Sequence, residues 1–346
     1  MTPPISVHSG WRTGSTYIWS KFRELPECMT FYEPFHEVLA SLTEATLPVW
    51  HPGQWDSGHP ELAQPYFAEY RPLMASGVHG FHPDFTARNY FVTDAARLGD
   101  QAAYLDSLQQ LSRRQHKRPV FNFCRSLGRM AWLCRTVPGT HVLLVRNPCD
   151  QWLSGYQQTQ KGNPYFEVMP YLLLGHAATH PVLGGVAEHW GIPRSAEEGS
   201  FADTYQQYEA VVGLRPATHS FGVFLDWYLY TFLAALPFVD IVLDMDRLAR
   251  VPAYRQAAST AFADTLHVTL SWDDARLTQY PLDARPKLWQ AMIGDALARL
   301  ERHWLPSMLR TTPALRAEHV QFVIQTVREE VQAPRMLWEP GTRPPS

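Results

Sequence analysis

The sequence predicts a three-layer α/β fold, in which a central parallel sheet carries helices on both faces and long insertions interrupt the pattern. Short β-type runs alternate with helical patterns along the chain. One run, residues 141–145, is continuously apolar, as expected of a strand that is buried on both faces. Parallel strands need crossover connections, and these place helices over the sheet.

The elements are predicted in order along the chain. Residues 5–8 predict a first strand, and a glycine-bearing loop then leads into a helix whose apolar positions 18, 19, 22 and 25 recur at helical spacing. A second strand should end near residue 33. Later strands are predicted over 120–124, 141–145 and 239–244, and helices over 94–114, 149–158, 221–236, 287–304 and 318–331.

The length of 346 residues, 45% of them apolar, suits one large α/β domain. We expect a single domain over residues 1–335, with insertions at about 45–90 and 160–220. Residues 336–346 form a short Pro-rich tail that is expected to be disordered.

The bulk charge excludes two classes of partner. A net charge of -3 does not predict a nucleic-acid or membrane-surface binder, so any anion site must be local.

The four cysteines show no CxxC spacing, which favours reduced intracellular thiols. The N-terminus lacks a basic region followed by a long apolar run, and no stretch predicts a transmembrane segment, so we expect a cytoplasmic protein.

The first chemical motif is the loop over residues 10–16, Gly-Trp-Arg-Thr-Gly-Ser-Thr, between the first strand and helix. Such a turn aims backbone N–H groups and the positive helix end at one point, while Arg12 adds a charge and Ser15 and Thr16 add hydroxyl donors. The loop lacks the lysine of a Walker A motif, which weakens an ATPase or GTPase interpretation. A plain strand-to-helix turn is the alternative.

The second motif begins where the strand over residues 141–145 ends in Arg146-Asn147-Pro148. Ser154 follows two helical turns later, so the two side chains can bind one phosphate together. The alternative is that Arg146 pairs with a carboxylate and Ser154 is a solvated helix residue.

The third motif is Phe31-Tyr32-Glu33-Pro34-Phe35-His36-Glu37, which places two kinds of proton acceptor at a predicted strand end. A glutamate before proline also occurs as an ordinary turn residue. Arg125 and Arg129, just after the strand over 120–124, are either contacts to substrate or solvated helix arginines.

Together and in this order, the three motifs resemble those of sulfotransferases that use 3'-phosphoadenosine-5'-phosphosulfate (PAPS). The resemblance is closest to the carbohydrate branch and its bacterial relatives, which read R-T-G-S-[ST], then Y/F-x-E-P, then a strand ending R-[DN]-P with a downstream Ser. It covers about a third of the chain, mainly residues 5–40 and 118–160. It implies a P-loop-NTPase-like sulfotransferase fold with its insertions on the acceptor side.

The resemblance also implies roles for individual residues. The 5'-phosphosulfate would be held by Arg12, Thr13, Gly14, Ser15 and Thr16, and the 3'-phosphate by Arg146 and Ser154. Tyr17 stands where relatives often place an aromatic residue against the adenine, although a core role suits it equally well. Arg12 replaces the Lys of the cytosolic small-molecule branch, which argues for the glycan branch.

The implied reaction is in-line sulfuryl transfer from PAPS to a hydroxyl or amine acceptor, a carbohydrate first, with the nucleotide product PAP and no metal. Arg12 would stabilise charge on the leaving phosphate oxygen, and Glu33 would act as the general base, with His36 as second choice. Neither His79 with His82 nor His176 with His180 has the further ligands of a metal site. A non-catalytic PAP-binding module and a kinase-like phosphotransferase stay open as alternatives.

Overall fold

The computed structural model describes every residue except 1, 53–58, 93–97, 197, 279–286 and 329–346. The chain divides into two compact units. Among the described residues, the first unit comprises those of 2–145 and 239–277, and the second comprises those of 146–238 and 278–328. The expected single domain over residues 1–335 stays a prediction, and the expected disordered tail over 336–346 lies outside the described residues.

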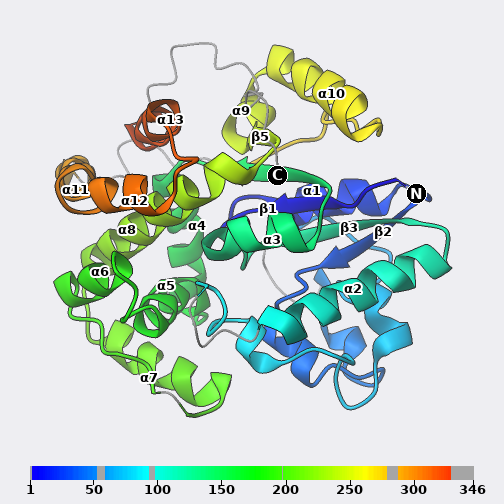
Figure 1. The fold of residues 1–346 in the computed structure, drawn as a ribbon, viewed down its shortest axis with the longest axis horizontal. Helices are drawn as coiled ribbons and strands as arrows, with labels where there is room; N and C mark the ends of the chain where they lie inside the picture. Colours follow the sequence, from blue (N-terminus) through cyan, green and yellow to red (C-terminus); the bar gives the residue numbers. More distant parts are fainter. Residues whose placement is uncertain (1, 53–58, 93–97, 197, 279–286, 329–346) are drawn as a thin grey trace. The chain divides into compact units, whose positions relative to one another are not determined.

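The first unit contains a five-stranded sheet in which every pair of neighbours is parallel (Figure 1). Its strands are β1 (Ile5–His8), β2 (Cys28–Tyr32), β3 (Arg118–Phe123), β4 (Thr140–Val145) and β5 (Ile241–Asp244). The order across the sheet is β2-β3-β1-β4-β5. The carboxyl end of the central strand β1 therefore lies between those of β3 and β4, where parallel sheets typically bind ligands. The predicted α/β fold class with a central parallel sheet is confirmed.

Helices cover both faces of this sheet (Figure 1). One face carries α1 (Ser15–Arg23) and α10 (Pro252–Leu266), because Ile18 and Phe262 share an apolar core with Ile5 and Val7 of β1. The other face carries α2 (Leu98–Arg114) and α3 (Met130–Thr136), which lie in front of the sheet in Figure 1. All four residues of β1 are buried, as expected of a central strand.

Shorter helical turns connect the elements of this unit. They are η1 (Glu37–Ala40), η2 (Leu47–Val49), η4 (Ala68–Leu73), η5 (Pro83–Phe85), η6 (Leu127–Arg129) and α9 (Met245–Arg250). The predicted insertion over 45–90 contains short 3-10 turns and an isolated antiparallel bridge between Met74 and Val78 among its described residues. The predicted helix over 94–114 is described from Leu98 onward.

The described residues of the second unit form helices joined by turns and irregular segments. It contains α4 (Pro148–Gln160), α5 (Tyr165–His176), α6 (Leu183–His189), α7 (Phe201–Gly213), α8 (Ala217–Ala235), η7 (Leu236–Phe238), α11 (Lys287–Arg299), a π-helical segment (Leu300–Trp304), α12 (Leu305–Thr311) and α13 (Ala317–Arg328). Among the helices searched, the stretch Ala217–Phe238 has the length and mean hydropathy, 1.4, of a membrane span, but 78% of its apolar window is buried. Such burial is typical of a core helix.

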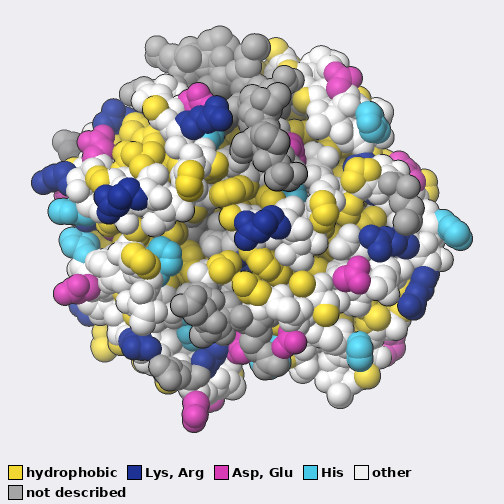
Figure 2. Space-filling model, viewed as in Figure 1, with side chains coloured by type: hydrophobic (Ala, Val, Ile, Leu, Met, Phe, Trp, Pro, Cys, Tyr) yellow, Lys and Arg dark blue, Asp and Glu magenta, His cyan; other side chains and the backbone are white. Residues whose placement is uncertain are grey.

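Charged side chains of both signs are interspersed over the face drawn in Figure 2. This pattern agrees with the net charge of -3. An anion site on this chain therefore depends on local groups rather than on a broad basic surface.

Candidate active site

The loop between β1 and α1 is shaped by two residues with positive φ. Gly14, the residue before α1, has φ 96°, and Arg12 has φ 62°. The buried Thr13 hydroxyl donates to the Gly10 carbonyl at 2.8 Å and so closes the turn. Because first-turn N–H groups have no acceptor within their own helix, the start of α1 at Ser15 directs N–H groups and the positive helix end toward this loop. This geometry suits an anion.

The first two hydroxyls of α1 connect the loop to neighbouring strand ends. Ser15 Oγ lies 3.1 Å from the Sγ of Cys124, which follows β3. Thr16 Oγ1 lies 3.0 Å from the hydroxyl of Tyr32, which ends β2. The beginning of α1 is therefore fixed against the carboxyl ends of both strands.

Arg12 is half-buried and supplies the positive charge of the loop. Its charge is felt by His59, whose pKa is lowered to about 4, mainly by burial and further by Arg12. His59 Nδ1 lies 2.5 Å from the hydroxyl of Tyr66. The imidazole is therefore neutral at physiological pH, and Arg12 carries the positive charge of this pair.

Glu33 lies directly after β2 and is only 7% exposed. Its φ is 39°, a conformation that is uncommon outside glycine. Its N–H donates to the carbonyl of Asn122 in β3 at 2.8 Å, and its Oε2 accepts from Arg125 Nη1. Arg125 Nη2 also donates to Oε2 of Glu37 at 3.0 Å. One guanidinium thus bridges two carboxylates.

His36 is held by the start of η1. Its Nδ1 accepts the N–H of Val38 at 3.2 Å, so the neutral ring carries its proton on Nε2. Burial lowers the pKa of His36, and nearby Glu37 partly offsets this effect. The unprotonated nitrogen of His36 is therefore occupied by the backbone, which disfavours it as a base.

The solvated interpretation of Arg125 and Arg129 is wrong, because each is only 1% exposed. Arg129 Nη2 donates to the carbonyls of Phe85 at 2.7 Å and Arg125 at 2.8 Å. Its guanidinium carbon lies 4.3 Å from the ring centre of Phe35. Among the described residues no carboxylate pairs with Arg129, and burial lowers its pKa to about 9. Sequence patterns missed this burial because the partners come from distant segments.

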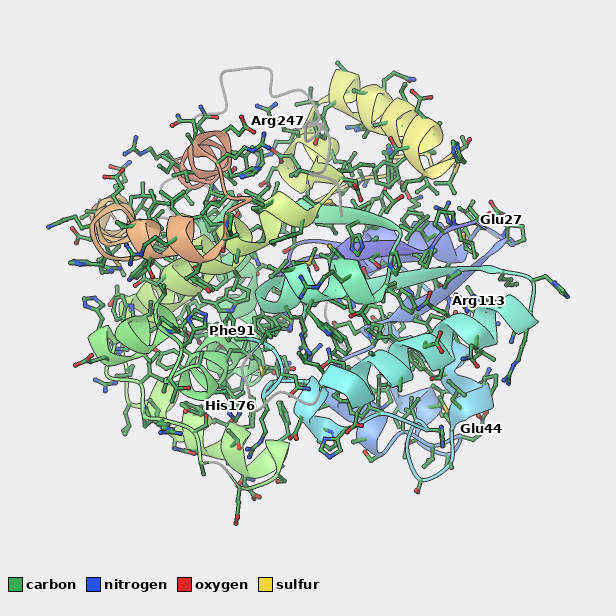
Figure 3. The ribbon with its side chains drawn as sticks, viewed as in Figure 1. Glu27, Glu44, Phe91, Arg113, His176 and Arg247 are labelled. Carbon is green, nitrogen blue, oxygen red and sulfur yellow. The ribbon has the colours of Figure 1, made fainter. Side chains whose placement is uncertain are left out.

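Aromatic residues pack closely over the turn that holds these arginines. A Cβ added at Gly128 would come within 2.5 Å of the Phe91 ring, which is labelled in Figure 3. The ring of Tyr90 lies 5.8 Å from the guanidinium carbon of Arg129. Position 128 therefore has no room for a side chain, and the turn is fixed by packing.

A fully buried hydrogen-bond chain lies under the same strand ends. His141 Nε2 donates to the Val137 carbonyl at 3.1 Å, so its Nδ1 accepts from His8 Nε2 at 2.9 Å. His8 Nδ1 in turn accepts from the hydroxyl of Ser126, the residue after Arg125, at 2.9 Å. Burial, and then the charge of His141, keep the pKa of His8 well below its usual range.

Tyr17 lies further along α1. Its hydroxyl donates to Oδ1 of Asp274 at 2.7 Å, and its ring is tilted against Trp272 at 6.4 Å. Lys21 pairs with the other oxygen of Asp274 at 2.8 Å. These contacts pack Tyr17 against the core of the first unit.

Arg146 and Ser154 belong to the second unit and are both buried. Arg146 directly follows β4, and its Nη2 donates to the carbonyl of Thr278 at 2.6 Å. Its own carbonyl accepts from the hydroxyl of Tyr228 at 3.0 Å. Asn147 caps α4 by accepting the N–H of Cys149 at 2.8 Å, which fixes the helix that carries Ser154.

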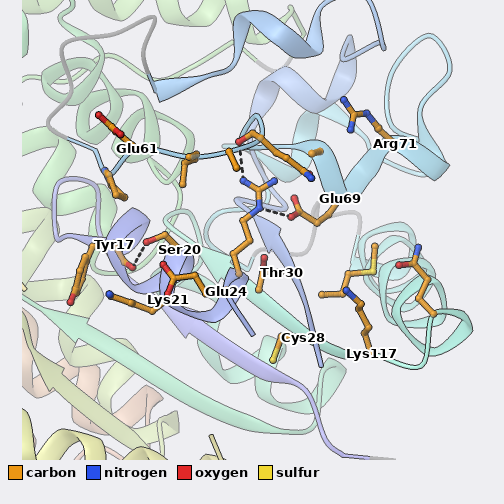
Figure 4. Close-up of a pocket in the computed structure, with 18 of the residues that line it drawn as sticks. Tyr17, Ser20, Lys21, Glu24, Cys28, Thr30, Glu61, Glu69, Arg71 and Lys117 are labelled. Carbon is orange, nitrogen blue, oxygen red and sulfur yellow. Dashed lines mark hydrogen bonds and ion pairs between the residues drawn. The ribbon is translucent and has the colours of Figure 1, made fainter. Parts of the chain in front are cut away.

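A separate cavity of about 830 Å³ runs along α1 in the first unit, and residues of the loop over 10–16 do not line it (Figure 4). Arg23 crosses it, pairing with Glu69 at 2.7 Å and donating to the carbonyls of Gln64 and Pro65. Lys21 and Arg71, which also line it, pair with Asp274 and Glu44. These three cations pair with carboxylates, and Lys117, labelled in Figure 4, also lines the cavity.

One of the histidines that suggested a metal makes other hydrogen bonds. His180 Nδ1 accepts the N–H of Val182 at 3.2 Å, and its Nε2 lies 3.1 Å from the hydroxyl of Tyr230. His176, labelled in Figure 3, ends α5. In the part of the chain that the structure describes, no group of three or more His, Cys, Asp or Glu residues is arranged to hold a metal ion.

The first unit thus brings the loop over residues 10–16, Glu33 and His36 to the carboxyl edge of one sheet. Comparison with known proteins adds little to this geometry. No family model and no curated protein matches the chain. A solved structure described as a sulfotransferase from Alicyclobacillus acidocaldarius is similar, with 14% identity over 87% of this chain and 95% of that chain and a TM-score of 0.34. This TM-score is too low to establish a shared fold, so a functional assignment depends on the chain's own residues.

Proposed function

We propose that this protein is a sulfotransferase that moves a sulfuryl group from PAPS to an acceptor hydroxyl, with a carbohydrate as the first candidate acceptor. One observation carries the proposal: an anion-binding loop and a buried, ion-paired carboxylate lie at the same edge of a parallel sheet. The loop bears Arg12 and ends in Gly14 at φ 96°, and the carboxylate is Glu33.

The loop fits the phosphosulfate end of the donor. Arg12 offers a cation, and the start of α1 offers the N–H groups of Ser15 and Thr16. The hydroxyl of Thr13 donates within the loop, so its part is to hold the turn in shape. Arg146 and Ser154 are proposed to bind the 3'-phosphate, as the motif resemblance implies.

The reaction requires one proton acceptor and one group that stabilises the leaving oxygen. The acceptor hydroxyl attacks sulfur, its proton passes to Glu33, and the bond from sulfur to the phosphate oxygen breaks with its electron pair on PAP. Arg12 would stabilise the charge that grows on that oxygen. The occupied Nδ1 of His36 favours Glu33 over His36 as the base.

The acceptor is proposed from the motif subclass. Arg12 in the loop and the Phe31-Tyr32-Glu33-Pro34 segment are typical of the glycan branch. Peptide, lipid and phenolic hydroxyls would undergo the same chemistry, so they belong in the test.

Two assays test the proposal. PAP without magnesium should raise the unfolding temperature, because a ligand at 100 times its Kd stabilises the folded state by about 2.7 kcal/mol. Stabilisation by ATP with magnesium, and none by PAP, would instead indicate a kinase-like phosphotransferase. Radiolabelled PAPS should then transfer label to polysaccharide, glycolipid, peptide or phenolic acceptors. PAP binding without transfer to any of these classes would indicate a non-catalytic binding module.

A further inference from the structure

Arg125 stands out among the buried charges of the first unit. It is the second residue after β3 and is 1% exposed. Its Nη1 donates to Glu33 and its Nη2 donates to Glu37, so each end of the guanidinium fork meets a different carboxylate. The side chain of Glu33 is 9% exposed and that of Glu37 is 20% exposed. Glu33 is therefore the inner and Glu37 the outer member of this bridge.

We propose that Arg125 is a positioning residue, which bridges Glu33 and Glu37 and thereby fixes the Glu33 carboxylate in its ionised form and in one orientation. This inference rests on the proposed function in that Glu33 is taken as the base. It assigns to Arg125 a role that the sequence motifs do not include. The guanidinium of Arg125 offsets the repulsion between the neighbouring carboxylates of Glu33 and Glu37.

The charges around the pair explain why one guanidinium is needed. Two carboxylates this close repel each other, and without a cation one of them holds a proton near neutral pH. The other titratable or charged groups facing them are Arg129, which pairs with no carboxylate among the described residues, and His36, whose Nδ1 lies 3.4 Å from Glu37. Tyr32 and Cys124 also lie near the bridge, and burial raises the pKa of both. Arg125 is therefore the only one of these groups that donates to both carboxylates.

The backbone on both sides of the bridge is fixed. Arg129 donates to the Arg125 carbonyl at 2.8 Å, and the next residue, Ser126, donates to His8 in β1. On the other side, Glu33 is held by Asn122, and the N–H of His36 donates to the Glu33 carbonyl at 2.9 Å. A rigid surround is what precise orientation of a base requires.

The φ of 39° at Glu33 supports the same conclusion. A non-glycine residue keeps such a conformation only where its surroundings determine it, and such positions cluster at functional sites. Here the hydrogen bonds of Glu33 and its ion pair with Arg125 together determine it.

The test is the pH dependence of sulfuryl transfer in Arg125→Met. We expect the acid limb of kcat/KM to move upward by about 1 to 3 pH units, because an opposite charge lowers a carboxyl pKa by about that amount. PAP affinity should stay within about twofold of wild type. Adding Glu37→Gln to Arg125→Met removes the repulsion and should return the limb at least halfway.

Matched variants separate positioning from general damage. Arg125→Lys keeps the charge but not the fork, so the limb should stay in place while kcat falls about tenfold or more. Arg129→Met removes a second buried arginine that bridges no carboxylates, so it should lower stability without moving the limb. The proposal would be overturned if the acid limb of kcat/KM lay at the same pH in wild type and in folded Arg125→Met. It would also be overturned if Arg125→Met and Arg129→Met moved this limb by the same amount.

An NMR titration tests the role of Arg125 without measuring sulfuryl transfer, so its result can be separated from that of the proposed function. In protein with 13C-labelled glutamate carboxyls, NMR titration assigned through Glu33→Gln should show the Glu33 carboxyl titrating at lower pH in wild type than in Arg125→Met. If wild type transfers no sulfuryl group but shows this shift, the proposed function fails and the bridging role of Arg125 stands. If wild type transfers sulfuryl groups and the shift is missing, the role of Arg125 fails alone.

Discussion

Gly14→Ala perturbs the loop at its most constrained backbone position. Gly14 has φ 96°, where a Cβ costs about 1 to 2 kcal/mol. The added Cβ would also lie 3.0 Å from Met245 Cε and 3.3 Å from Leu277 Cδ2. Since both are ends of flexible side chains, they can move slightly, and we expect a total loss of about 1 to 3 kcal/mol in the free energy of unfolding. The first-turn N–H groups of α1 would turn with the backbone.

Gly162→Ala is the matched control, because Gly162 has φ 88° and nothing within 4 Å of an added Cβ. Both variants should lose a similar amount from backbone strain, measured by denaturant unfolding. Only Gly14→Ala should weaken PAP binding in calorimetric titration, by about tenfold or more, which is about 1.4 kcal/mol. Wild-type PAP affinity in a folded Gly14→Ala variant, or equal losses of affinity in both variants, would refute the role of this loop.

Three further predictions concern single residues. Glu33→Gln should slow transfer about 100-fold or more while PAP affinity is retained, and full activity in steady-state kinetics would move the base elsewhere. Arg146→Ala should weaken PAP binding by about 2 to 4 kcal/mol in titration calorimetry, and unchanged affinity would remove Arg146 from the donor site. The pKa of His8 is lower in the folded protein than its unfolded value of about 6.5. The neutral His8 therefore contributes fully to the free energy of unfolding above about pH 6.5. As the pH falls below about 6.5, this contribution is lost by up to about 1.4 kcal/mol per pH unit. His8→Gln should therefore flatten the loss of unfolding free energy between pH 7.5 and 5 in denaturant titrations, and an unchanged slope would contradict the neutral state of His8.

The strands that carry the candidate site were predictable from local patterns. The predicted strand over residues 5–8 is β1, and the apolar run over 141–145 lies in β4, because buried parallel strands have continuous apolar runs. The helical spacing after the loop correctly predicted α1. Strand order was not predictable in this way: β3 lies between β1 and β2, and such pairing depends on contacts between distant segments.

Burial of charged side chains also escaped local patterns. The sequence around Arg125 is compatible with both a solvated and a buried arginine. Its burial follows from ion pairs with Glu33 and Glu37, which come after the end of β2 and are distant in sequence. The helix α10 was missed for a different reason. Its alanines, serine and threonines produce only a weak apolar stripe, although Phe262 and Leu266 anchor it in the core.

The measurement that most directly tests the central claim is calorimetric titration of the wild-type protein with PAP in the presence of EDTA. We expect binding at one site per chain with a Kd in the micromolar range, corresponding to about -8 kcal/mol, without any metal ion. No detectable binding at millimolar PAP, in a preparation that is folded by circular dichroism, would contradict the assignment of this chain as a PAPS-dependent sulfotransferase.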